Sequence, residues 1–158
     1  MFRAAVDLLT RRNRRAPAPL TVAAEPAPRT ILAVDDDDLI REALVAILSQ
    51  RGWQVFVAQD AAEALWVLER QHVDLVLADV DMPGLNGFEL TARIEARWPN
   101  LPVLLMSGAV LDRRAEEPQD FAARTFLQKP FSCAELLDRL EGTFRSRGLA
   151  GSAARRAG

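Results

Sequence analysis

The sequence is poor in cysteine and has no long apolar run. Cys133 is the single cysteine, so the chain can form neither an intramolecular disulfide nor a cysteine-rich metal site. No apolar stretch approaches the ~20 residues that a membrane-spanning helix needs. The first residues do not form a signal peptide, because Asp7 interrupts their apolar run. These absences exclude a disulfide-rich secreted protein and predict a cytoplasmic one in a reducing compartment.

Lysine is nearly absent as well. Nineteen of the 20 basic residues are arginines, and the one lysine is Lys129. Charge is also unevenly distributed, with a net +4 over residues 1–29, −10 over residues 30–144 and +4 over residues 145–158. An acidic body between basic ends is not typical of a nucleic-acid-binding domain, so no direct binding of nucleic acid is expected.

The chain divides by composition into one folded domain and its flanks. Residues 1–15 form a basic segment that is either a frayed tail or a short helix for docking on a membrane surface or a partner. Residues 16–29 are rich in Pro and Ala and are typical of a linker. Residues 30–145 carry the pattern of a folded domain, and residues 146–158 are expected to be a flexible basic tail.

Short apolar runs alternate with amphipathic segments throughout the domain. Strands are predicted at 30–34, 53–58, 73–78, 102–106 and 124–128. Helices are predicted at 38–50, 60–71, 86–97, about 111–119 and 132–145, of which 111–119 is the weakest because it contains Pro118. Five such units predict an α/β fold, a doubly wound five-stranded parallel sheet of order 2-1-3-4-5. A ligand site is expected at the carboxyl ends of the first and third strands.

Polar side chains follow four of these strands. Asp35 and Asp36 end the first, Asp79 the third and Ser107 the fourth, while Lys129 follows the fifth. Because the carboxyl ends of parallel strands meet at one edge of the sheet, these side chains are expected to share one crevice.

The chemistry of this set is that of a phosphoryl site. Asp79 can attack phosphorus as a nucleophile, and Asp35 and Asp36 can hold a hard divalent cation such as Mg²⁺. Lys129 suits pairing first with Asp79 and then with a phosphoryl group, and Ser107 can donate a hydrogen bond to that group.

The run of four aspartates, Asp35 to Asp38, is expected to have two roles. Asp35 and Asp36 face the crevice. Asp37 and Asp38 are interpreted as the first residues of the following helix, where they cap it and favour its dipole.

At this point the sequence resembles the receiver domain of two-component response regulators, over residues 30–145. The motifs that carry the resemblance are VDDD at 34–37, DVDMPGLNG at 79–87, MSG at 106–108 and FLQKPF at 126–131. Together, in this order and on these elements, they are a specific signal.

The resemblance implies a role for each acidic residue. Asp79 would be the phosphoacceptor and Asp36 a direct Mg²⁺ ligand, as would Asp79 itself. Asp35 would act on the metal through water, and Asp81 would contribute its backbone carbonyl.

The resemblance also implies a switch. Ser107 and Lys129 would contact the phosphoryl group, and the Lys129–Pro130 peptide bond is expected to be cis. Phosphorylation would draw Ser107 toward Asp79, and the ring of Phe126 would fill the vacated space. Since Phe126 has no hydroxyl, the inward position of the ring carries no polar cost.

By the same resemblance the chain is a signalling switch and not an enzyme. It would take its phosphoryl group from a histidine kinase or a histidine phosphotransfer protein. It would signal to a protein partner through the face made by residues 111–119, 124–128 and 132–145, and a dimer through this face stays open. The sequence contains no recognisable output domain, so a stand-alone receiver is expected.

Two other functions match parts of this pattern. An aspartyl phosphatase of the haloacid dehalogenase type also uses an Asp-x-Asp motif, which Asp79 and Asp81 match. That motif is expected on a first strand, and it would leave Asp35 and Asp36 unexplained. A receiver that has lost phosphorylation is disfavoured because every required residue is present.

Overall fold

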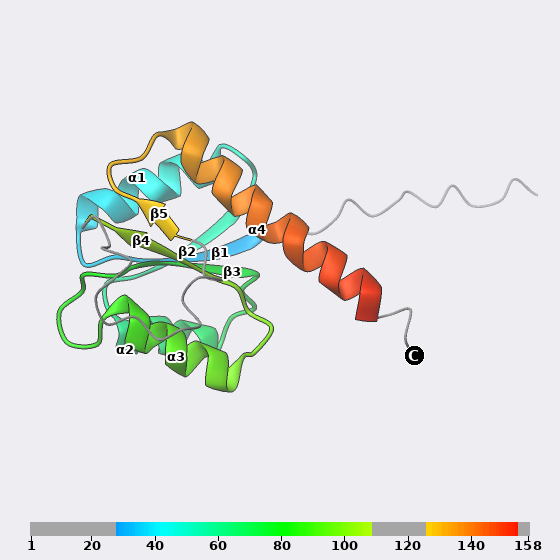
Figure 1. Ribbon diagram of the computed structural model, residues 1–158. Coiled ribbons are helices and arrows are strands. Elements are labelled where there is room, and N and C mark those ends of the chain that lie inside the picture. The colour runs from blue at the N-terminus through cyan, green and yellow to red at the C-terminus, as the bar shows by residue number, and fades with distance from the viewer. Residues whose placement is uncertain (1–27, 109–125, 155–158) are drawn as a thin grey trace, which may run out of the picture.

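The computed structural model describes residues 28–108 and 126–154. Strands and helices alternate along the chain in these ranges (Figure 1). In order they are β1 (Thr30–Val34), α1 (Asp38–Ser49), β2 (Gln54–Ala58), α2 (Ala61–Leu68), β3 (Leu75–Asp79), α3 (Gly87–Arg97), β4 (Val103–Ser107), β5 (Phe126–Gln128) and α4 (Cys133–Ala154).

The strands form one parallel sheet of order β2-β1-β3-β4-β5. The predicted fold class and strand order are therefore confirmed. β1 and β3 lie inside the sheet and every residue of both is buried. This burial explains why their sequences are continuously apolar up to the residues that carry chemistry.

Two apolar layers cover the sheet, one on each face. Alternate strand residues point to opposite faces, so Leu32 and Val76 pack with α2 and α3, while Ile31 and Leu75 pack with α1 and α4. Figure 1 shows α1 and α4 on one side of the sheet and α2 and α3 on the other. This arrangement leaves the ends of the strands free to form a site.

Helix starts near the site are fixed by side chains. The carboxylate of Asp37 caps α1 by accepting from the backbone N–H groups of Leu39 and Ile40, and Asp38 is the first helical residue. The predicted role of Asp37 and Asp38 at the start of this helix is thus confirmed. Asn86 and Glu89 form a reciprocal capping box at the start of α3, which holds that helix close to the end of β3.

Several predicted boundaries were wrong by a few residues. β3 runs from Leu75 to Asp79 instead of 73–78, because pairing with β1 begins at Ile31↔Leu75 and pairing with β4 continues to Asp79↔Met106. Asp79 is consequently part of the strand. The predicted helix at 111–119 lies outside the described residues, as do the first two residues of the predicted strand at 124–128.

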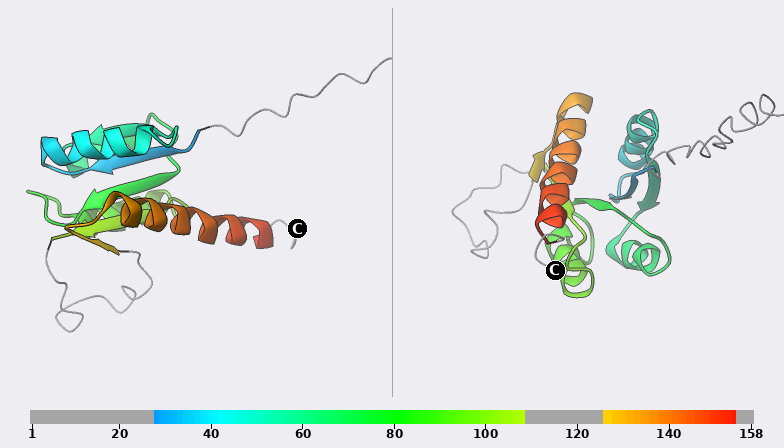
Figure 2. Two further views of the ribbon diagram at one scale, coloured as in Figure 1. Left: turned by 90° about the horizontal axis from the view of Figure 1, so that it is seen from above. Right: turned by 90° about the vertical axis from the view of Figure 1, so that its right-hand side faces the viewer.

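The largest boundary error concerns the last helix. We expected it to end at Arg145, but α4 continues to Ala154, beyond the edge of the sheet (Figures 1 and 2). A helix can continue without an apolar face, because its backbone hydrogen bonds form within the segment and alanine favours them. The described part of the expected tail, 146–154, is therefore helical. Neither α4 nor any other helix in the described ranges is long and apolar enough to cross a membrane.

Candidate functional site

The polar side chains predicted to converge lie at one edge of the sheet. Asp35 directly follows β1, while Asp79 and Ser107 are the last residues of β3 and β4. These three residues are buried, with exposed fractions of 1%, 5% and 2% respectively. Lys129 follows β5 and is partly buried.

Lys129 joins two of the carboxylates. Its Nζ donates to Oδ2 of Asp35 at 2.8 Å and lies 3.0 Å from Oδ1 of Asp79. The Lys129–Pro130 peptide bond is cis in the structure. One ammonium therefore offsets the repulsion between two buried carboxylates that come from different strands.

A third carboxylate completes an acidic cluster. Oxygens of Asp35, Asp36 and Asp79 all lie within 4.8 Å of one another, and Asp36 is exposed. Hard divalent cations prefer carboxylate oxygens, and an exposed carboxylate beside two buried ones leaves a route for a hydrated ion. The donor set fits Mg²⁺, because oxygen ligands alone surround the position and Lys129 neutralises only part of their charge.

Burial and charge act in opposite directions on these groups. Burial raises the pKa of Asp79, as do the charges of Asp35 and Asp81, although the hydrogen bond and charge of Lys129 oppose the rise. Burial alone would lower the pKa of Lys129, but its hydrogen bonds and charge interactions with Asp35 and Asp79 raise it. Lys129 is consequently held as a cation at neutral pH.

Backbone pairing beyond the strand ends fixes the positions of these residues. The N–H of Asp35 donates to the carbonyl of Ala58 at 3.2 Å, and that of Val80 to Met106 at 2.8 Å. The N–H of Lys129 donates to the carbonyl of Ser107 at 2.7 Å. The candidate residues Asp35, Asp79 and Lys129 are thereby held against the neighbouring strands, which fixes the site on the side of the sheet.

The sequence analysis missed a residue that shapes the site, Gly87. A Cβ atom added there would lie 2.3 Å from the carbonyl oxygen of Asp79 and 2.9 Å from the Cα of Val80. Only glycine allows α3 to start this close to the end of β3. Gly87 stood in a quoted motif, and its place directly after the helix cap Asn86 was the available signal.

Two further predicted residues are not part of the cluster. Asp81 is exposed, and its carboxylate is not among the three that cluster. Phe126 is half-buried, and its ring meets that of Phe88 edge to face at a centroid distance of 6.2 Å. Phe126 pairs with Leu105 across the β4–β5 ladder, two residues before Ser107.

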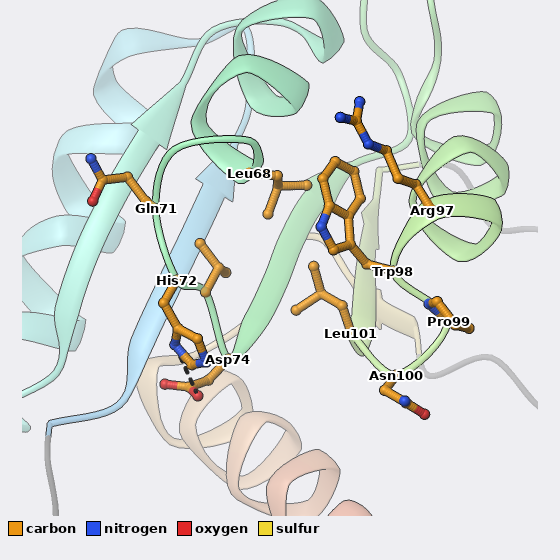
Figure 3. A pocket seen from close by; sticks show the side chains of 10 residues that line it. Leu68, Gln71, His72, Asp74, Arg97, Trp98, Pro99, Asn100 and Leu101 are labelled. Atoms are coloured by element: carbon orange, nitrogen blue, oxygen red, sulfur yellow. Dashed lines mark ion pairs between the residues drawn. The ribbon is translucent and has the colours of Figure 1, made fainter.

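A cavity of about 530 Å³ lies elsewhere, between the ends of α2 and α3 (Figure 3). Trp98, Leu68 and Leu101 line it together with His72, which faces Asp74 at 3.8 Å. Asp74 binds the backbone of Thr30 at the beginning of β1. The cavity therefore opens at the amino ends of the strands, away from the carboxylates and Lys129.

Comparison with known proteins identifies the family. The family model described as the response regulator receiver domain matches residues 31–141. The chain belongs to the response regulator receiver family. Receiver domains of this family act as switches in two-component systems, and phosphorylation on an aspartate and binding of Mg²⁺ are typical of them.

Two similar proteins are regulators longer than this chain. The response regulator protein FleR of Pseudomonas aeruginosa is 46% identical over 109 residues, which is 68% of this chain and 23% of that protein. The response regulator MprA of a Mycobacterium species is 36% identical over 118 residues, 75% of this chain and 51% of that protein. The chain thus spans about a quarter to a half of the length of these two relatives.

Solved structures agree with the fold of this receiver. Response regulator protein TrrA from Thermotoga maritima, in complex with Mg²⁺–BeF, has 29% identity and a TM-score of 0.66, covering 73% of this chain and 98% of that one. A chemotaxis response regulator of Vibrio cholerae has 29% identity and a TM-score of 0.67, with the same coverage of 73% and 98%.

Proposed function

We propose that this receiver accepts a phosphoryl group on Asp79 from a histidine kinase or a histidine phosphotransfer protein, with Mg²⁺ bound at the acidic cluster. We further propose that it acts as a stand-alone switch, with residues 30–145 as the receiver unit and a protein partner as its output. The contact of Lys129 with both Asp35 and Asp79 supports this assignment above all other observations.

The reason is the position and the charged surroundings that this contact gives to the Asp79 carboxylate. Its carboxylate lies at the rim of the sheet, next to two further carboxylates and one ammonium. An oxygen of Asp79 can attack the phosphorus of a phosphohistidine, forming a P–O bond while the P–N bond breaks and the leaving imidazole takes up a proton. Lys129 can then pair with the new phosphoryl oxygens, and it keeps Asp35 as a partner throughout.

The other residues would bind and orient. Asp36, Asp35, Asp79 and the backbone carbonyl of Asp81 would hold the cation, directly or through water. Mg²⁺, when bound, supplies positive charge that neutralises the phosphoryl oxygens. Ser107 would donate its hydroxyl to the phosphoryl group from the neighbouring strand.

The proposed output follows from the connection between Ser107 and β5. A shift of Ser107 toward Asp79 acts on its backbone partner Lys129 and, along the same ladder, on Phe126. The half-buried ring of Phe126 can move farther inward, which would change the face made by β5 and α4. A downstream protein, or a second receiver in a dimer, would read this face.

The phosphatase alternative has less support. Asp79 ends the third strand along the chain, and the Asp81 carboxylate stands apart from the cluster. That alternative leaves Asp35 unexplained, although Asp35 directly follows β1 and its carboxylate pairs with Lys129 at 2.8 Å.

The test is labelling with acetyl phosphate. Incubation of the full chain with acetyl phosphate and Mg²⁺ should add the mass of one phosphoryl group, and removal of Mg²⁺ with EDTA should prevent it. Asp79→Asn should abolish the addition, whereas the control Asp138→Asn, at an exposed position on α4, should label like the wild type. Equal labelling of the Asp79→Asn variant in intact-mass spectra would reject Asp79 as the acceptor.

A further inference from the structure

Arg41 lies in the first turns of α1 and makes two side-chain contacts with the run of aspartates. One guanidinium nitrogen, Nη1, donates to the backbone carbonyl of Asp35, and the other, Nη2, donates to the carboxylate of Asp38. The Arg41 side chain is only 14% exposed, although its partner Asp38 is 82% exposed. Such burial of an arginine with two fixed partners is unlike a mobile surface ion pair.

Two residues, Asp36 and Asp37, lie between these two contacts, and of the two only Asp36 belongs to the acidic cluster. In residues 28–108 and 126–154 we find no hydrogen bond or ion pair to its side chain. Its position therefore depends on its neighbours. The N–H of Asp35 binds Ala58, the N–H of Asp37 donates to Oδ1 of Asp35 at 3.0 Å, and the carbonyl of Asp35 accepts from Arg41.

Of these three hydrogen bonds, only the one from Arg41 involves a side chain of α1. The carbonyl of Asp35 belongs to the peptide unit that leads into Asp36, so a donor on this oxygen fixes the plane of that peptide. The second contact draws the carboxylate of Asp38 to Arg41, on the exposed side of the helix start. The two contacts thus lie on either side of Asp36, whose carboxylate is within 4.8 Å of those of Asp35 and Asp79, and Asp38 has a partner of its own.

We propose that Arg41 is a positioning residue of the metal site, which holds the Asp35–Asp36 peptide so that the Asp36 carboxylate meets the cation. This inference rests on the proposed Mg²⁺ site. A planar guanidinium with two donors can bridge a carbonyl and a carboxylate, whereas the point charge of a lysine cannot hold both in the same way.

The charge of Arg41 opposes its geometric effect, and this opposition makes the proposal testable. A cation near the site repels Mg²⁺, so loss of the charge alone would tighten binding. Loss of the tether would weaken it. Arg41→Gln removes both the charge and the pair of guanidinium donors. Arg41→Lys keeps the charge and removes only the pair of donors. If positioning dominates, both variants bind Mg²⁺ more weakly.

The experiment is a titration of ¹⁵N-labelled full chain with Mg²⁺, followed by the amide signals of residues 35–37 and 79–81. Removal of a group that orients a metal ligand typically costs at least about tenfold in affinity, and we expect about this loss for Arg41→Gln and a smaller loss for Arg41→Lys. The matched control is Arg51→Gln, which removes the same charge beyond the far end of α1, where Arg51 pairs with Glu141 at 3.6 Å. It should leave the affinity unchanged.

A second readout measures the tether without metal. The backbone amide of Asp37 donates a hydrogen bond to the Asp35 carboxylate. Its hydrogen exchange with solvent should become faster in both Arg41 variants, while the buried amides of β1 stay protected. A merely structural role would instead lower the protection of the whole domain, leaving the Mg²⁺ affinity of the folded fraction intact.

The outcomes separate this inference from the proposed function. Wild-type protein that shows no Mg²⁺-dependent shifts would defeat the proposed metal site and this inference with it. Wild-type binding with unchanged binding by Arg41→Lys and tighter binding by Arg41→Gln would leave the metal site standing and overturn the positioning role, because the effect would then be one of charge alone.

Discussion

Replacement of Gly87 by alanine should destabilise the domain at the point where α3 meets the end of β3 at the candidate site. The added Cβ would lie 2.3 Å from the carbonyl oxygen of Asp79, 2.9 Å from the Cα of Val80 and 3.0 Å from the carbonyl carbon of Asp79. All three are backbone atoms of the strand end, so no side chain can rotate away to make room. Either α3 or the Asp79–Val80 peptide must shift.

The magnitude follows from two opposing effects. Insertion of one carbon into a well-packed interior costs about 1–3 kcal/mol, and contact with three backbone atoms places Gly87→Ala toward the upper part of that range. Alanine gains at most ~1 kcal/mol over glycine through helix propensity, and less at the first residue of a helix. We therefore expect a net loss of about 1–2 kcal/mol in the free energy of unfolding, and a fall of roughly 4–8 °C in Tm.

The chain supplies a matched control for this change. Gly142 lies inside α4, and a Cβ added there meets no atom within 4 Å. Gly142→Ala should accordingly gain up to about 1 kcal/mol from propensity alone. Urea unfolding followed by circular dichroism measures both variants. The close-approach argument fails if Gly87→Ala is as stable as the wild type, or if it gains stability as Gly142→Ala does.

Two further predictions concern the charged groups of the site in the absence of Mg²⁺. Because the pKa of Asp79 is raised in the folded state, mainly by burial, its ionisation costs folding free energy as pH rises through that pKa. Asp79→Asn should then be more stable than the wild type at pH 7, with a difference in urea midpoint that shrinks as the pH falls toward 4. A variant less stable than the wild type at pH 7 would contradict this sign. Lys129→Ala leaves Asp35 and Asp79 without their shared cation, so the free energy of unfolding should fall by about 3 kcal/mol, and millimolar Mg²⁺ should restore part of it. No recovery with Mg²⁺ in thermal melts would mean that the cation does not reach these carboxylates.

The sheet order could be predicted because two independent sequence patterns indicate it. Apolar runs such as Leu75–Ala78 indicate strands covered on both faces, and the amphipathic segments between them indicate crossover helices. A right-handed crossover then leaves few topologies. The strand ends were harder to predict, since they depend on which neighbouring strand is long enough to pair, as Asp79 shows by pairing with Met106.

The end of α4 could not be predicted from the apolar pattern. Amphipathic spacing reports only the part of a helix that packs on the sheet, and over 133–146, where the burial of α4 is described, the fully buried residues are Leu136 and Leu140. Phe144 still packs partly on that core, and the helix then continues to Ala154. A pattern of burial therefore gives a lower limit for the length of a helix that projects from a domain.

The candidate site divides in a similar way between what composition reveals and what only packing reveals. The carboxylates, the hydroxyl and the single lysine could be recognised in the sequence, because their residue types directly follow predicted strands. Gly87 and Arg41 act through close approach and through a bond to a backbone carbonyl, and neither contact leaves a pattern of residue types. One partial signal existed, since Asp38 and Arg41 stand three apart on a helix, a spacing typical of ion pairs.

The four consecutive aspartates illustrate why these less visible residues matter. Four carboxylates in sequence would repel one another, yet each has a different surrounding in the fold. Asp35 meets Lys129, Asp37 caps α1 and Asp38 meets Arg41, so three of the four charges are already compensated by the protein. Asp36 is the one left exposed beside Asp35 and Asp79. A bound cation at this edge of the sheet would therefore complete the charge balance of the aspartate run. If Lys129, Arg41 or the amides capped by Asp37 were lost, a second carboxylate would be left uncompensated, and the free negative charge would no longer be confined to Asp36.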